Sequence, residues 1–155
     1  MMTVQEKAYL AGLLDGEGYF QIKSFNPAYR HTFDPIVCIV HTYRSLLEWL
    51  ASTYGGKTIK CHEPRSPKHR QEYRWQIGTR VIVTLLPEVI PSLRVKRQKA
   101  EIVLTLAKLN ILRNVGTKYH KPLTEEEKTE RYRLKNNLDI LNKVGPTIPA
   151  QFNLV

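Results

Sequence analysis

The stretch that decides the fold runs from Tyr9 to Phe20 and reads YLAGLLDGEGYF. Its first half continues an apolar helical run that the capping-box pair Thr3 and Glu6 introduces. Asp15 and Glu17 stand at the end of this helix, where the helix dipole is already negative. Carboxylates at that end need a compensating cation, and a bound divalent metal supplies one. The stretch therefore predicts an acidic, metal-binding helix terminus.

Small residues give the same helix a stripe that is almost free of side chains, formed by Ala8, Ala11, Gly12 and Gly16. An internal glycine costs a helix about 1 kcal/mol, and a bare stripe lets a second backbone approach closely. We therefore expect two helices packed together, with their acidic ends side by side.

Residues Leu10 to Gly18 resemble the nine-residue signature of the LAGLIDADG homing endonucleases. The competing interpretation is a buried helix with a glycine C-cap and two solvated acids, but such a helix rarely ends Asp-Gly-Glu-Gly before an aromatic strand start. The sequence holds one copy of the signature, and family members with one copy act as homodimers. The resemblance therefore implies a homodimer whose interface contains Ala8, Ala11, Gly12, Leu13 and Asp15.

The chain of 155 residues, 42% of them hydrophobic, predicts one domain over residues 1–155 with a sizeable core. No run of eighteen apolar residues is present, so we expect no membrane partner. The N-terminus lacks a signal-peptide core, and Cys38 and Cys61 lie in strand-like contexts without metal-ligand spacing. We therefore expect reduced thiols in a protein that is not secreted and is intracellular, in an organelle or prokaryotic cytoplasm that holds its target DNA.

The fold class predicted from periodicity is α+β. Helical and alternating patterns follow one another in the order of helix 3–14, strands 18–25 and 32–42, helix 45–54, strands 57–63 and 71–77, and helices 80–90, 96–112 and 124–143. This order agrees with the α-β-β-α-β-β-α homing endonuclease fold that the resemblance implies. That fold has a four-stranded antiparallel sheet that binds DNA. We expect a core over residues 3–112, a C-terminal helical extension over 122–155, and an irregular tail from Gly145 to Pro149.

Charge indicates the partner. The net charge of +10 and the pI of about 9.7 point to a polyanion, most often nucleic acid. An antiparallel sheet packs one face on its helices and leaves the other face free for contacts. Residues that suit base edges and phosphates of double-stranded DNA on that face are Gln21, Lys23, Lys60, His62, Arg70, Arg74 and Gln76. Tyr19 and Phe25 keep single strands or RNA open as a less favoured partner.

The resemblance also implies a site for phosphodiester hydrolysis. Glu17 takes the metal-binding position, where Asp is more usual, and the carbonyl of Gly16 adds an oxygen ligand, while Asp15 is structural. Oxygen ligands favour Mg²⁺; we expect Mn²⁺ to substitute, and Ca²⁺ to bind without supporting cleavage. Lys96 resembles the active-site lysine, with Arg94 as the alternative. His41 and Arg44 resemble polar positions that order water around the phosphate, although the family often has an amide at the position of His41.

Together these features predict a homodimeric, Mg²⁺-dependent DNA endonuclease that makes a double-strand break in a long pseudo-palindromic target, as in intron homing. A compact domain of this size is roughly 40 Å across, so two abreast would cover about 20–24 base pairs. Two alternatives stay open. One is a maturase-like RNA-binding splicing factor, and the other is a noncatalytic DNA-binding regulator on the same fold.

Overall fold

A computed structural model describes residues 2–26, 31–64, 66–114 and 122–144 of the chain. The first half forms helix α1 (Val4–Glu17), strands β1 (Gly18–Phe25) and β2 (Thr32–His41), helix α2 (Arg44–Tyr54), and strands β3 (Lys57–Lys60) and β4 (Tyr73–Ile77). The second half is helical, with α3 (Thr79–Val89), the short 3-10 turn η1 (Ile90–Ser92), α4 (Arg97–Asn114) and α5 (Glu125–Val144). The predicted α+β class and element order are confirmed.

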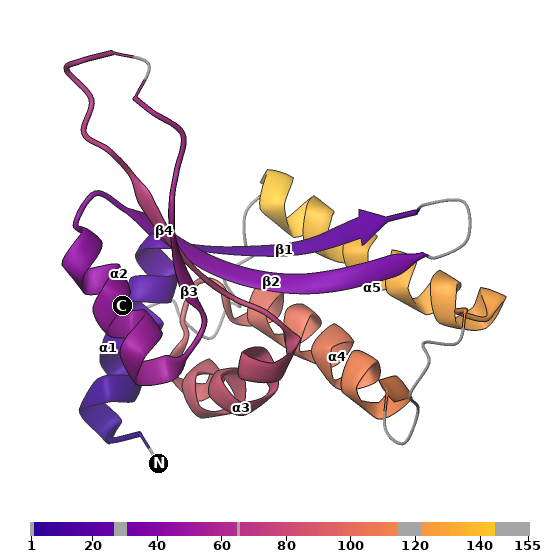
Figure 1. The fold of residues 1–155 in the computed structure, drawn as a ribbon. Coiled ribbons are helices and arrows are strands. Elements are labelled where there is room, and N and C mark those ends of the chain that lie inside the picture. Colours follow the sequence, from indigo (N-terminus) through magenta and orange to yellow (C-terminus); the bar gives the residue numbers. More distant parts are fainter. Residues whose placement is uncertain (1, 27–30, 65, 115–121, 145–155) are drawn as a thin grey trace.

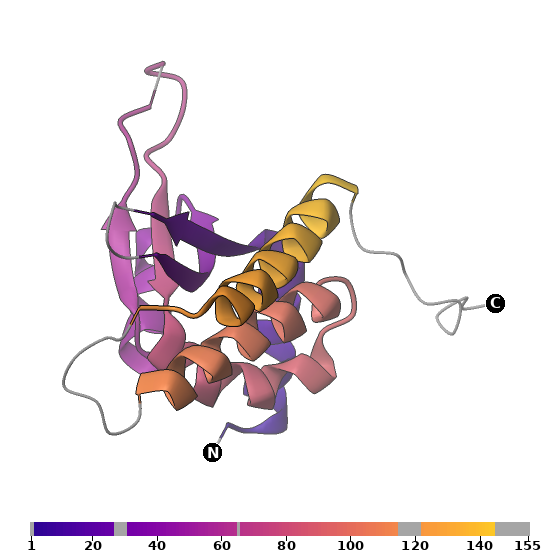
Figure 2. The same cartoon turned by 90° about the vertical axis from the view of Figure 1, so that its right-hand side faces the viewer.

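The four strands form one antiparallel sheet in the order β1-β2-β4-β3 (Figure 1). Gly18 lies opposite Ile39, and Val40 lies opposite Arg74. The helices gather on one side of this sheet, as the two perpendicular views show (Figures 1 and 2). Because successive strand residues point to opposite faces, the helix side takes every second residue of each strand.

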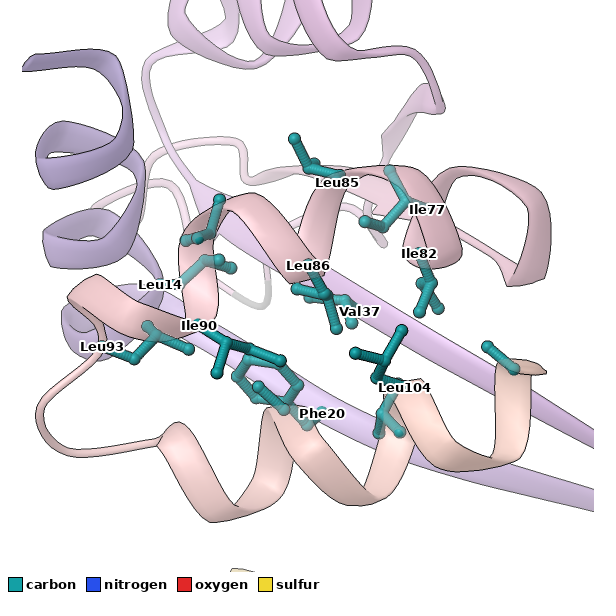
Figure 3. Close-up of a cluster of buried hydrophobic side chains, with 14 of the residues drawn as sticks. Leu14, Phe20, Val37, Ile77, Ile82, Leu85, Leu86, Ile90, Leu93 and Leu104 are labelled. Atoms are coloured by element: carbon teal, nitrogen blue, oxygen red, sulfur yellow. The ribbon is translucent and has the colours of Figure 1, made fainter. Parts of the chain in front are cut away.

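The core lies between the sheet and the helices. Phe20 of β1, Val37 of β2 and Ile77 of β4 point from the sheet toward Leu86 of α3 and Leu104 of α4 (Figure 3). All five side chains are buried, in agreement with the apolar alternation of the strands. Trp75 of β4 is fully buried in the same layer.

Gly18 joins α1 to β1 without a loop. Its N–H donates to the carbonyl of Leu14, while its own backbone is already extended. A Cβ on Gly18 would lie 2.3 Å from the oxygen of Leu14, so only glycine allows this abrupt change. Glu17 is consequently held at the corner between helix and strand. At the other end of α1, Thr3 and Glu6 form the predicted capping box.

Strands β3 and β4 are shorter than predicted, because the ladder stops at the pair Lys60 and Tyr73. Residues 61–64 and 66–72, between the two strands, lie in a hairpin loop that projects from the sheet (Figure 1). Hydrogen bonds hold the base of this loop together. The N–H of Cys61 donates to the carbonyl of Glu72 at 3.0 Å. The side-chain amide of Gln71 donates to the carbonyls of Cys61, His62 and Glu72.

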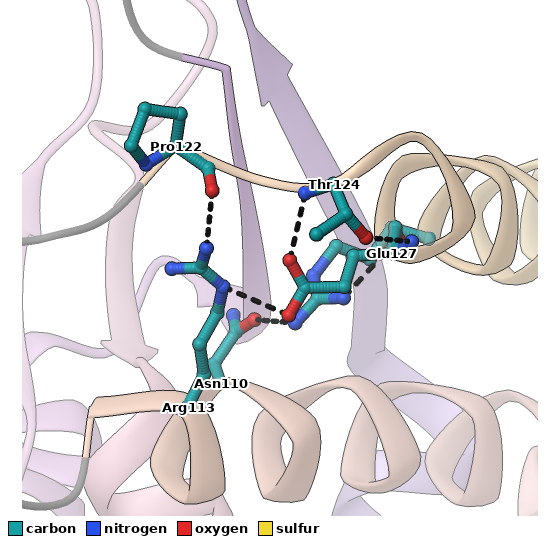
Figure 4. Close-up of polar contacts among 6 residues, drawn as sticks. Asn110, Arg113, Pro122, Thr124 and Glu127 are labelled. Atoms are coloured by element: carbon teal, nitrogen blue, oxygen red, sulfur yellow. Dashed lines mark hydrogen bonds and ion pairs between the residues drawn. The ribbon is translucent and has the colours of Figure 1, made fainter.

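Helix α5 packs against α4 and along the edge strand β1 (Figure 2). A polar network fixes its start. Thr124 and Glu127 each bond the backbone N–H of the other, which caps the helix (Figure 4). Arg113 of α4 donates to the carboxylate of Glu127 at 3.0 Å and to the carbonyl of Pro122 at 2.6 Å. Arg131 donates to the side-chain oxygen of Asn110. The extension is thus a fixed part of the fold over its described helix. The predicted irregular tail lies outside the described residues. Within the described helices, none is long and apolar enough to cross a bilayer.

Candidate active site and nucleic-acid interface

Asp15 anchors the segment that precedes α4. Its carboxylate accepts three backbone N–H groups, from Arg94 at 2.8 Å, Val95 at 3.2 Å and Lys96 at 2.9 Å. The carboxylate therefore has a structural function, but its partners lie in its own chain. This differs from the expectation that Asp15 bonds across a pair of helices.

Lys96 is brought to the end of α1 by this anchor. Its ammonium donates to the carbonyl of Gly18 at 2.8 Å and to that of Gly16 at 3.3 Å. The last turn of α1 contains no basic residue of its own, so Lys96 supplies the cation that the helix C-terminus favours. Burial lowers the pKa of Lys96, and the charge of Lys99 adds to this, whereas Asp15 and Glu17 act in the opposite direction.

Glu17 is the exposed last residue of α1. Its carboxylate makes no hydrogen bond or ion pair with the described residues. With the carbonyl of Gly16 it offers hard oxygen donors, which fit Mg²⁺ or Ca²⁺. Across the described ranges, no three His, Cys, Asp or Glu side chains gather closely enough to hold a metal. A single described chain therefore offers part of a ligand set rather than a complete cage.

His41 is the last residue of β2, and Arg44 begins α2 shortly after it. This end of β2 lies beside the end of α1, because Gly18 pairs with Ile39. The Nδ1 of His41 accepts the Tyr43 N–H at 2.9 Å, which fixes the ring in the turn before α2. Arg44 begins α2, where it pairs with Glu48 at 2.7 Å and lies over the ring of Tyr73. Both side chains thus have partners of their own at this end of the sheet.

The outer face of α1 carries the small residues. Ala8 and Gly12 are exposed, and Leu13 is half-buried. A Cβ added to Gly12 or to Gly16 would meet no neighbouring atom of the described residues within 4 Å, so packing among these residues does not require glycine at either position. Ala11 is 1% exposed and lies in the chain's own core, so its expected place at a subunit interface is wrong. The helical spacing turns Ala11 inward together with Leu10 and Leu14.

The strand register defines the side of the sheet away from the helices, which we call the open face. It is formed by Tyr19, Gln21, Lys23, Phe25, Thr32, Asp34, Ile36, Cys38, Val40, Lys57, Ile59, Arg74 and Gln76. Four predicted DNA-binding residues, Gln21, Lys23, Arg74 and Gln76, are among these. The middle of the face is more apolar than predicted, because β2 places Ile36, Cys38 and Val40 there. Cys38 is a free thiol, as is Cys61, and burial raises the pKa of Cys38.

Lys60 does not share the open face. It pairs with Tyr73 and forms an ion pair with Glu63, and the register puts it on the helix side with Thr58. The prediction for Lys60 as a residue of that face is therefore wrong, and Lys57, opposite Gln76, takes this place. A strand of four residues carries too little alternation to reveal its phase from sequence. The pairing with β4, whose buried Trp75 fixes the phase, would have identified Lys57.

His62 and Arg70 are exposed on the projecting hairpin rather than on the sheet. With Lys68 and His69 they line an open hollow of about 630 Å³ beside the base of the loop. They place further basic residues on the hairpin that leads into β4.

No family model matches the sequence, and no curated protein matches it. Solved structures do match. The homing endonuclease I-CvuI, in complex with the I-CreI target, has a TM-score of 0.67 at 17% identity over 88% of this chain and 82% of that chain. The LAGLIDADG homing endonuclease I-GzeII, in complex with its DNA target, has a TM-score of 0.66 at 15% identity over 96% and 53%. The LAGLIDADG meganuclease I-AabMI, bound to uncleaved DNA, has a TM-score of 0.61 at 21% identity over 91% and 50%. This chain thus spans most of I-CvuI and about half of the other two, and its architecture is the fold of the LAGLIDADG homing endonucleases.

Proposed function

We propose that this chain is a homodimeric, metal-dependent endonuclease that makes a site-specific double-strand break in a long pseudo-palindromic DNA target, as in intron homing. One observation carries the proposal. The carboxylate of Glu17, which makes no hydrogen bond with the described residues, lies at the tip of a helix on whose outer glycines an added Cβ would meet no neighbouring atom of those residues. The solved neighbours support a DNA substrate, since they were determined as complexes with DNA targets.

The glycines support self-association. Gly12, in the interior of α1, lowers helix stability by about 1 kcal/mol relative to alanine, and no contact inside the described chain compensates for this. A second copy packed on this stripe would bring a second Glu17 close to the first. Two carboxylates with backbone carbonyls would then complete the partial ligand set.

The donor set fits Mg²⁺, which when bound would make an attacking water more acidic and offset negative charge on the phosphate. Glu17 and the carbonyl of Gly16 would hold the ion. Lys96, kept at the corner by Asp15, would present its ammonium to the negative charge that develops on the phosphate. His41 and Arg44 would order water at the end of β2. Two of the neighbours were solved with Mg²⁺ or Ca²⁺ present, which supports a divalent ion.

The test uses the full chain and a duplex selected by binding from a random library, then inserted into a supercoiled plasmid. With Mg²⁺ the wild type should yield linear plasmid, and Glu17→Gln should bind the same duplex but leave the plasmid intact. Glu126→Gln, a change at an exposed carboxylate on α5, is the matched control and should cut normally. Intact plasmid with verified binding would show a noncatalytic regulator instead.

A maturase-like RNA-binding function has one observation in its favour. Tyr19 is 47% exposed and Phe25 is 66% exposed on the open face, where unpaired bases could stack. A competition-binding assay distinguishes the RNA-binding function from the endonuclease function. If single-stranded or structured RNA displaces duplex DNA at lower concentration than unlabelled duplex does, the RNA function is favoured; the endonuclease proposal expects the reverse.

A further inference from the structure

Arg74 has a buried guanidinium nitrogen without a partner. Its Nε is inaccessible to solvent and bonds no atom of the described residues, and these residues give its other nitrogens no acceptor. The other two described arginines that are not exposed, Arg113 and Arg131, both donate within the network at the start of α5. The guanidinium of Arg74 is therefore not satisfied by the described chain.

The two residues paired with Arg74 across the sheet offer it no acceptor. Val40 and Ile59 lie directly opposite it on the two adjacent strands and share its face, and neither side chain can accept a hydrogen bond. Arg74 is half-buried beside these aliphatic residues, and its two Nη atoms are not among the buried unpartnered atoms. The two terminal nitrogens of the guanidinium are therefore left for an acceptor outside the described chain.

Position within the sheet distinguishes a base from a phosphate as the partner. Lys23 and Lys57 lie on the outer strands β1 and β3, whereas Arg74 lies on the inner strand β4. When a sheet enters the major groove, its outer strands lie near the phosphates of the groove walls and its inner strands face the base edges. Two parallel donors on an inner strand match two adjacent acceptors on one base, and guanine presents O6 and N7 in that way.

We propose that Arg74 is a specificity-determining residue that reads one guanine in each half of the target through its major-groove edge. This rests on the proposed function, because it requires a duplex on the open face. Loss of a bidentate contact of this type should reduce discrimination at that base pair by about 5- to 150-fold.

The experiment compares binding-site selections from a random duplex library by the full-length wild type, Arg74→Gln and Lys57→Gln. We expect the wild type to enrich guanine at a fixed position in each half-site. Arg74→Gln should lose that preference, while Lys57→Gln should bind all sequences more weakly and keep it. Arg74→Lys retains the charge without the fork, so it should also lose the guanine, and thermal melts of each variant report folding.

Persistence of the guanine in the sites selected by either Arg74 variant would overturn the inference and leave the endonuclease proposal standing. Equal loss of the guanine in Lys57→Gln would also overturn it, because general charge would then account for the preference. If the folded wild type bound no duplex, the proposed function and this inference would fail together.

Discussion

Replacing Gly12 by alanine should change the stability of the isolated subunit and the affinity of the dimer in opposite directions. The new Cβ would meet no neighbouring atom of the described residues within 4 Å, so it creates no clash among them. Alanine favours a helix interior by about 1 kcal/mol over glycine. For a chain of this length that gain corresponds to a rise in Tm of about 2–4 °C. The isolated subunit should therefore become more stable.

The same change should weaken a dimer formed through this stripe. A twofold interface would receive two added methyl groups, and overpacking of a close contact costs about 1–3 kcal/mol for each. The dimer dissociation constant should then rise by on the order of 30-fold or more. A more stable subunit combined with a weaker dimer would indicate that Gly12 serves the contact between subunits.

Thermal melts over a range of protein concentrations and sedimentation velocity measure the two effects separately. Gly18→Ala is the matched control, because its Cβ would lie 2.3 Å from the oxygen of Leu14 and should destabilise the subunit itself. If Gly12→Ala raised Tm and left self-association unchanged, the stripe would not be the subunit interface. A fall in the Tm of the isolated subunit would refute the reasoning about its packing.

Three further outcomes follow from the described contacts. Asp15→Asn should lower the unfolding free energy by about 1–3 kcal/mol in urea titrations, because an NH₂ group then replaces one of the carboxylate oxygens that accept the N–H groups of residues 94–96. An unchanged urea midpoint would show that these hydrogen bonds do not stabilise the fold. The Thr124 N–H, together with Arg113, holds the pKa of Glu127 below its usual 4.5. Its contribution is therefore full above pH 4.5 and is lost as pH falls through the lowered pKa, so the Tm difference between wild type and Glu127→Gln should shrink in acid; a constant difference would contradict this. Affinity for duplex DNA should fall by on the order of 10³-fold between 50 and 200 mM salt, as measured by fluorescence anisotropy, and a flat response would exclude phosphate contacts by the open face.

Local sequence patterns were sufficient for the order of elements. Thr3 and Glu6 define the start of α1 through neighbouring backbone groups, and Gly18 defines its end through a clash with Leu14 four residues away. The alternation in β1 and β4 identified the buried faces, because apolar burial repeats every second residue in a strand. Such interactions span a few residues, so the sequence contains both partners in one window.

Contacts between distant segments decided the rest. The side of the sheet on which Lys57 and Lys60 lie depends on pairing with Tyr73 and Gln76, which a strand of four residues cannot specify alone. The partners of Asp15 lie about eighty residues away, and the inward turn of Ala11 depends on the core that forms around it. The sequence alone therefore determined the elements and the chemistry at the helix terminus, since these depend on local geometry and residue type. Only the tertiary structure decided which face each side chain occupies and which partner it meets, because strand register and helix packing are set by contacts across the whole fold.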